Sequence, residues 1–191
     1  MRRSRAFLII LLSVAGTALL VGCQKKGSGG STDENVSVPK GDPAFTPLSD
    51  SWVVDNVGAM QQEAVLECHR ICRKLQDDGI AEMVVLIQNG VKHPAQYATH
   101  YGRWLKLGKR ALSTKGGNNG VVWLIRPDAG EKMTYSIGRG LPKLTSSHMV
   151  DIMNEAKEYL NFGNYDSGVL VLVRKTDEQL RSMYGKKGTG Q

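Results

Sequence analysis

Met83-Val84-Val85-Leu86-Ile87 is the stretch of sequence that decides the fold class. Its five residues are all apolar, and polar residues stand close to it on both sides. A short apolar run of this kind is typical of a β-strand that is covered on both faces of its sheet. Because both faces need cover, helices must flank the strand, and an α/β architecture is indicated.

The segments on either side of this strand have helical spacing. Before it, apolar residues recur at three and four positions over residues 60–77, which predicts a helix with one buried face. Gly79 then stands where a left-handed cap residue commonly ends a helix. After the strand, Pro94 suits the first turn of a second helix, and Gly108 is expected to stop it.

The remainder of the domain continues the alternation of strands and helices. Val121-Val122-Trp123-Leu124-Ile125 is a second apolar strand, and residues 132–137 alternate polar with apolar, as expected of its hairpin partner. Two further helices are predicted, over about residues 146–160 and 165–183. We therefore expect a single α/β/α sandwich, with a small central sheet covered by helices, over residues 51–184.

The N-terminus has the order of a secretory signal. Three arginines in the first five residues precede an uncharged apolar run over residues 6–21. This run ends in Leu20-Val21-Gly22-Cys23, which resembles the lipobox of bacterial lipoproteins. The resemblance implies a signal peptide over residues 1–22 and a lipid on Cys23. An uncleaved anchor helix and an ordinary signal with a chance cysteine are the alternatives.

Low-complexity segments flank the predicted domain. Residues 23–50 consist largely of Gly, Ser, Pro and charged residues, including Gly27-Ser28-Gly29-Gly30-Ser31, and have little to bury. We predict that they form a flexible tether between the lipidated cysteine and the domain. Residues 185–191 are expected to form a short flexible tail.

The charge of the chain points away from nucleic acid. Three of the 25 Lys and Arg residues lie in the predicted signal, whereas all 18 Asp and Glu residues lie after it. Removal of the signal therefore leaves 22 basic and 18 acidic residues, a net charge of +4. The sequence has no basic stripe interleaved with aromatic residues, so no nucleic-acid partner is expected. The expected partner is a membrane, reached through the lipid anchor from the periplasm or the exterior. Gln24 lacks the aspartate that commonly marks inner-membrane retention, which favours the outer membrane where a cell has one.

Cys68 and Cys72 are the two other cysteines. Their spacing fits neither haem attachment nor the usual redox motif. On a helix they would share a face with Cα atoms about 6 Å apart, but their Cβ separation would exceed the ideal of about 4 Å. We therefore predict two buried thiols, and a disulfide in an oxidising envelope is the alternative.

Common catalytic motifs are absent from the sequence, including a nucleophile elbow, a phosphate-binding loop with Gly-Lys-Ser/Thr and His-Glu-x-x-His. Four polar residues instead fall in loops that we expect to converge at one end of the sheet. Asp55, Asn118 and Asn119 offer the oxygen ligands that Ca²⁺ or Mg²⁺ prefers. Arg139 is a candidate contact for phosphate or another anionic ligand. For the asparagines the alternative is structural, because Asn tolerates left-handed turns.

Six short motifs also occur in a characteristic order, and together they resemble the TPM domain. This family includes thylakoid-lumen photosystem II repair proteins and many bacterial envelope proteins. The resemblance implies an α/β/α sandwich outside the cytoplasm, often attached to a membrane, with some members described as Ca²⁺-binding and some as acid phosphatases. The motifs are Val54-Asp55-Asn56-x-Gly58, Tyr97-Ala98 through Trp104-x-x-x-Gly108, Asn119-Gly120-Val121, Gly138-Arg139-Gly140-Leu141, Leu144-Thr145 and Phe162-Gly163-Asn164-Tyr165.

Two positions depart from the family pattern. Pro142 and Ser146 stand where the family commonly has Glu and Asp, and the loss of two carboxylates weakens metal binding. We therefore expect a non-catalytic binding module that assists the assembly or maintenance of membrane protein complexes, with no cofactor other than weakly bound calcium. A metal-dependent phosphatase of small phosphate esters is the alternative, with Asp55 holding the ion and Arg139 the phosphate.

Overall fold

The computed structural model describes residues 31–32, 45–108 and 117–185. The predicted signal peptide, Cys23, most of the predicted tether and nearly all of the predicted tail lie outside the described residues. In chain order the elements are β1 (Ser31–Thr32), β2 (Val53–Asp55), α1 (Gln62–Asp77), β3 (Glu82–Ile87), α2 (Pro94–Trp104), β4 (Gly120–Ile125), β5 (Met133–Ile137), α3 (Ser146–Asn161) and α4 (Tyr165–Tyr184).

The strands form one mixed sheet in the order β1-β5-β4-β3-β2. β2, β3 and β4 are parallel, β5 is antiparallel to β4, and β1 pairs in parallel with the last two residues of β5. Parallel neighbours need a crossover, which α1 and α2 supply, whereas a short turn is enough to join β4 to β5. The two apolar strands and the hairpin predicted from sequence are confirmed. β2 was not expected, because three residues are too few to display a strand period.

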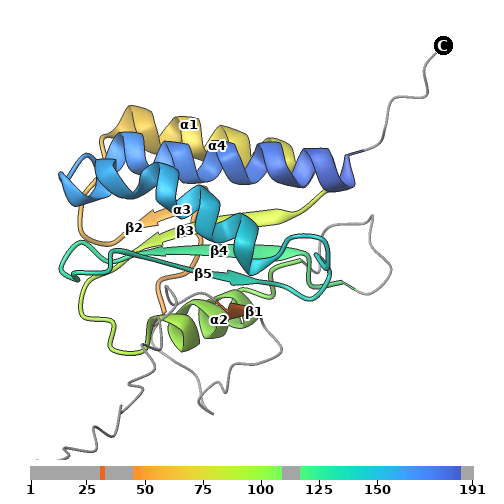
Figure 1. The fold of residues 1–191 in the computed structure, drawn as a ribbon, viewed down its shortest axis with the longest axis horizontal. Helices are drawn as coiled ribbons and strands as arrows, with labels where there is room; N and C mark the ends of the chain where they lie inside the picture. Colours follow the sequence, from red (N-terminus) through yellow and green to blue (C-terminus); the bar gives the residue numbers. More distant parts are fainter. Residues whose placement is uncertain (1–30, 33–44, 109–116, 186–191) are drawn as a thin grey trace, which may run out of the picture.

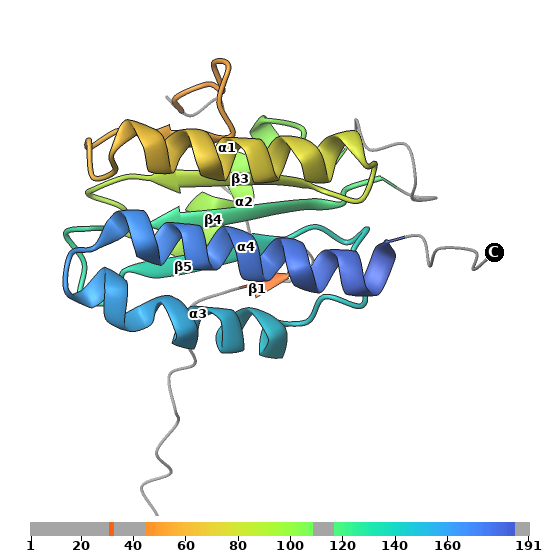
Figure 2. The same cartoon turned by 90° about the horizontal axis from the view of Figure 1, so that it is seen from above.

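The helices cover both faces of the sheet (Figures 1 and 2). α1, α4 and α3 lie side by side on one face, and α2 lies on the other. Two neighbouring residues of β4 point to opposite faces of the sheet. Trp123 Nε1 donates a hydrogen bond to Thr176 Oγ1 of α4 at 3.1 Å, whereas Val122 packs beside Gly102 of α2. The predicted α/β/α sandwich is therefore confirmed. Within the described ranges, no helix combines the length and the apolar character needed to cross a bilayer.

Residues 45–50 pack on the domain, although the sequence assigns them to the tether. Phe45 is buried, and its ring meets those of Tyr97, Tyr101 and Trp104 of α2 edge-on. The Tyr101 hydroxyl also donates to the Thr46 carbonyl at 2.9 Å. Burial of one large aromatic ring against three others outweighs the polar composition around it, so this part of the chain is ordered as domain.

Candidate functional site

The sheet separates the residues that we expected to converge. Asp55 ends β2, level with Ile87 of β3 and Ile125 of β4. Asn119 immediately precedes β4 and lies six residues before Ile125, or about 20 Å at the usual rise per residue. The expectation that these loops meet at one end is therefore wrong. β2 and β4 run in the same direction, so a residue after one strand and a residue before the other lie at opposite ends.

Asp55 closes the loop that leads into α1. Its Oδ1 accepts a hydrogen bond from the Val57 N–H at 3.1 Å, and its Oδ2 accepts one from the Met60 N–H at 2.9 Å. The side chain is half-buried, so both bonds are partly shielded from water. This carboxylate fixes the path of the chain from β2 into the first helix, which gives it a structural role whether or not it also binds a ligand.

Other polar residues lie at the same end of the sheet as Asp55. The Asn56 amide donates to Gln88 Oε1 at 2.6 Å, joining the chain after β2 to the chain after β3. Asp128, in the turn after β4, accepts a hydrogen bond from the Gly90 N–H at 2.8 Å. Asn56, Gln88 and Asp128 were not among the residues predicted from the sequence to form a site. The sequence does contain a pattern that predicts this group. Each of these residues closely follows an apolar run, and the carboxyl ends of parallel strands share one edge of the sheet.

The carboxyl ends of β2 and β3 are the position at which an α/β sheet most commonly binds a ligand. The chain leaves β2 toward α1 on one face and leaves β3 toward α2 on the other (Figure 1). Ligands of open α/β sheets bind outside the carboxyl ends of neighbouring strands whose connections diverge in this way. Asp55, Asn56 and Gln88 are therefore the residues of this chain that stand at that position.

At the opposite end of the sheet, Asn118 and Asn119 hold loops together. Asn118 has a φ of 60°, and its carbonyl accepts the Gly140 N–H at 2.9 Å. Asn119 is fully buried, and its amide donates to the Ile80 carbonyl at 2.8 Å. These are the contacts expected of the structural alternative. Asn119 Oδ1 has no hydrogen-bond partner among the described residues.

The glycines of two motifs permit close packing of these same loops. A Cβ on Gly108 would lie 2.2 Å from the Asn119 nitrogen, and a Cβ on Gly138 would lie 2.1 Å from the Asn118 oxygen. Both distances are far below van der Waals contact, so only glycine fits. The motifs around these glycines thus have a packing explanation at this end of the sheet.

Glu82 is a buried carboxylate that no motif in the sequence marks. It is 1% exposed, and it opens β3 beside the packed loops. Its Oε2 accepts the Gly108 N–H at 2.8 Å, and its Oε1 accepts the Gln76 amide at 3.2 Å. Burial of a charged group requires such partners, so Glu82 anchors the loop after α2 to the start of the sheet.

The predicted ligand set is not assembled in the fold. Arg139 is exposed and follows β5, which places it at the end occupied by Asn118 and remote from Asp55. In the parts of the chain that the structure describes, no three His, Cys, Asp or Glu residues gather closely enough to hold a metal ion. Asp55 and the two asparagines therefore do not fit a common calcium site.

The comparison with known families agrees with this architecture. The sequence profile of the TPM domain matches residues 53–179, from the start of β2 to within α4. The chain belongs to the TPM domain family. The matched residues include β2 to β5, the helices α1, α2 and α3, and most of α4.

Solved structures share the fold of this TPM domain. The N-terminal domain of the cg2496 protein from Corynebacterium glutamicum aligns with 13% identity and a TM-score of 0.55, over 81% of this chain and 93% of that domain. The N-terminal domain of a P. gingivalis protein aligns with 16% identity and a TM-score of 0.60, over 75% and 90% of the two chains.

A third solved structure is the BA42 protein from the psychrophilic bacterium Bizionia argentinensis. It aligns with 16% identity and a TM-score of 0.52, over 70% of this chain and 90% of that protein. No curated protein matches the chain by sequence. At these identities the likeness extends to the fold alone.

Proposed function

We propose that the chain is a lipoprotein whose TPM domain is a non-catalytic binding module of the cell envelope. The lipid on Cys23 would hold it at a membrane, facing the periplasm or the exterior, where it would assist the assembly or maintenance of membrane protein complexes. The anchoring half of the proposal rests on the arginines, the apolar run and the lipobox at the N-terminus. More than one acyl chain gives stable attachment to a bilayer.

The separation of Asp55 from Arg139 carries the non-catalytic half of the proposal. A metal-dependent phosphatase needs its ion and its phosphate-binding cation within a few ångströms of the same phosphate group. Here the residues that would take these roles stand at opposite ends of the sheet. Asp55 is level with Met133 of β5, and Arg139 lies beyond Ile137 at the other end of that strand, so the two are more than about 13 Å apart along the strands. They are also three strands apart across the sheet. No single small phosphate ester spans that distance.

Cell fractionation tests the lipid anchor. The wild-type chain is expected in the membrane fraction, with an acylated Cys23 seen in its intact mass. The Cys23→Ser variant is expected to leave the membrane or to accumulate with its signal uncleaved. Cys68→Ser is the matched control and should stay membrane-bound, since Cys68 lies inside the domain. An unmodified mature Cys23 in the wild-type protein would refute the anchor.

A second experiment separates a binding module from a phosphatase. The full-length chain is purified from detergent-solubilised membranes after crosslinking in cells, and a generic phosphate-ester assay is run on it with and without Ca²⁺ and Mg²⁺. We expect a membrane protein complex among the crosslinked products and no turnover above that of Asp55→Asn. Metal-dependent turnover that is lost in Asp55→Asn would establish the phosphatase instead.

A further inference from the structure

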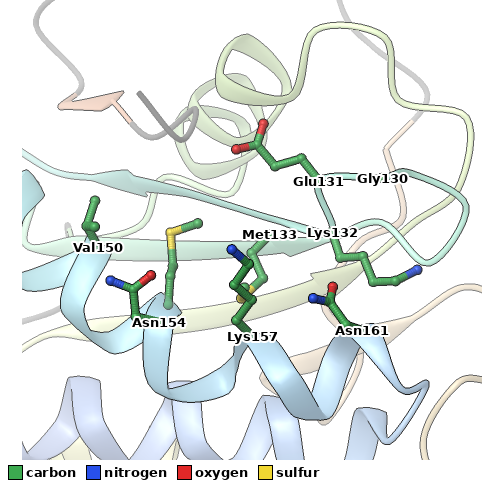
Figure 3. Close-up of a pocket in the computed structure, with 9 residues that line it drawn as sticks. Gly130, Glu131, Lys132, Met133, Val150, Asn154, Lys157 and Asn161 are labelled. Carbon is green, nitrogen blue, oxygen red and sulfur yellow. The ribbon is translucent and has the colours of Figure 1, made fainter. Parts of the chain in front are cut away.

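A groove lies between α3 and the hairpin that joins β4 to β5 (Figure 3). Its volume is about 330 Å³, and the side chains of Met133, Met153 and Val150 give it an apolar lining. Asn154, Lys157 and Asn161 point from α3 toward the hairpin, and Lys132 stands on the hairpin itself (Figure 3). Nothing in the proposed anchoring mechanism uses this groove.

The charges of α3 are sorted around the helix. Val150, Asn154, Lys157 and Asn161 form one stripe along the groove, at the spacing of successive helical turns. The three carboxylates of α3 lie on a stripe about 100° further around the helix, and one of them, Glu155, contacts Lys175 of α4 at 3.2 Å. The acidic stripe consists of Asp151, Glu155 and Glu158.

Lys157 is therefore a cation without a carboxylate partner among the described residues. Its helical neighbours toward the groove are Asn154 and Asn161, which offer amides where an acidic residue would have made an ion pair. Glu131, on the hairpin, points away from α3 (Figure 3). Glu131 belongs to the lining on the hairpin side, so it is the α3 wall of the groove that presents positive charge and neutral amides without a carboxylate.

The hairpin side of the groove is held in place by its own hydrogen bonds. Lys132 Nζ donates to the Pro127 carbonyl at 2.6 Å and lies 6.0 Å from the centre of the Tyr165 ring. Arg126 Nη2 donates to the Glu131 carbonyl at the other side of the turn. A rigid wall loses little conformational entropy when a ligand binds, which favours a preformed site.

We infer that this groove binds a carboxylate carried by an extended segment of a partner protein in which acidic and apolar residues alternate. Lys157 and the two asparagine amides would receive the carboxylate, and the methionines would receive an apolar side chain, since flexible thioethers adapt to many shapes. The inference rests on the proposed binding function and names the chemistry that the partner would present.

NMR titration of the full-length, nitrogen-15-labelled chain in detergent micelles tests the site. The probe is the acetylated, amidated peptide Val-Glu-Val-Glu-Val-Glu, and its neutral counterpart has Gln in place of each Glu. We expect the acidic peptide to shift the resonances of Met133, Asn154 and Asn161, and the neutral peptide to bind about tenfold more weakly or not at all. Raising the salt concentration should weaken binding of the acidic peptide.

Charge reversal supplies the variant and its control. Lys157 is exposed, so the Lys157→Glu variant should fold normally. We expect this variant to bind the acidic peptide about tenfold more weakly than the wild type, or weaker still. Lys74→Glu makes the same charge change on an exposed residue of α1, across α4 from the groove. That control should bind the peptide as the wild type does.

Three outcomes would overturn the assignment. They are equal binding of the neutral peptide, an unchanged affinity in Lys157→Glu, and tighter binding of free glutarate than of the peptide, which would indicate a small-molecule acid site. If one of these outcomes is found while the wild-type chain still crosslinks to a membrane complex, the proposed binding function stands and only the groove assignment fails. If the wild-type chain gives no crosslinked membrane protein complex, the proposed function itself is refuted.

Discussion

Cys68 and Cys72 lie one turn apart on α1, with their side chains wholly buried between α1 and the rest of the core. Burial raises the pKa of the Cys68 thiol to about 12, and it raises the pKa of Cys72 well above its ordinary value. The structure holds both as free thiols, as the helix geometry predicts. Because the thiolate is the reactive form, neither residue is suited to redox or nucleophilic chemistry.

The first prediction concerns these thiols. In the native chain at pH 7, a maleimide should modify Cys68 and Cys72 at least ~100-fold more slowly than in denaturant, because reaction requires local unfolding. Mass spectrometry of the quenched time course measures both rates. Fast modification of the native chain, or a linked Cys68–Cys72 peptide in most molecules on non-reducing mapping, would contradict the prediction.

Glu67 joins two helices through its carboxylate. It accepts hydrogen bonds from Arg70 on α1 at 2.9 Å and from Arg174 on α4 at 3.2 Å. These bonds lower the pKa of Glu67 from 4.5 to about 2. Because the pKa is lower in the folded chain, the contribution to stability is complete above the unfolded value and is lost as the pH falls through about 2.

The second prediction follows from this pKa. Glu67→Gln should be less stable than the wild type at pH 7, and the two proteins should approach equal stability as the pH falls from about 4.5 to about 2. Urea unfolding at a series of pH values measures the difference. A gap between the two proteins that does not change over this range would show that the carboxylate charge contributes nothing.

At the scale of the elements, three loops meet at the amino end of β3 and β4. The loop after α2, the residues before β4 and the turn after β5 approach within the distance that only glycine permits. The buried Glu82 carboxylate and the Gly108 N–H tie the first of these loops to β3. The packing of this end depends on backbone contacts, which is why glycine motifs occur here.

The third prediction tests that packing. Gly108→Ala should destabilise the fold by more than about 2 kcal/mol, because the residue has a φ of 79° and its added Cβ would lie 2.2 Å from the Asn119 nitrogen. Gly130→Ala is the matched control. Gly130 has open space where the Cβ would go, so this change should stay within about 0.5 kcal/mol. Chemical denaturation that finds equal effects at the two positions would rule out the packing explanation.

At the scale of the whole molecule, the direction of the strands divides the polar residues into two groups. Asp55 belongs to the carboxyl end of the parallel strands, and Asn118, Asn119 and Arg139 belong to the other end. The two asparagines therefore add no oxygen to an ion held at Asp55, and a site with fewer ligands has weaker Ca²⁺ affinity, since ligand number and charge control such sites.

The fourth prediction is that calcium leaves the stability of the chain almost unchanged. At 100 µM Ca²⁺ and millimolar affinity or weaker, the thermal midpoint should rise by less than about 0.5 °C. Differential scanning calorimetry with and without Ca²⁺, on the wild type and on Asp55→Asn, makes the measurement. Micromolar binding that disappears in Asp55→Asn would mean that other oxygens complete a site around this carboxylate.

The sequence by itself determined the fold class, the family and most of the elements. The apolar runs of β3 and β4 and the helical spacing of α1 are local patterns, and such patterns depend on neighbours within one or two turns of the chain. The packed position of Phe45 and the short strand β2 escaped this reasoning, because a single aromatic residue and a three-residue strand carry no period.

Only the tertiary structure decided which residues share a site. Asp55 and Asn119 were each correctly placed next to a strand, but their separation depends on the order and direction of β2, β3 and β4 in the sheet. The same holds for the groove, where Lys157 faces the β4–β5 hairpin from a helix that follows it in the chain. These relations arise from contacts between distant segments, which no local pattern in the sequence encodes.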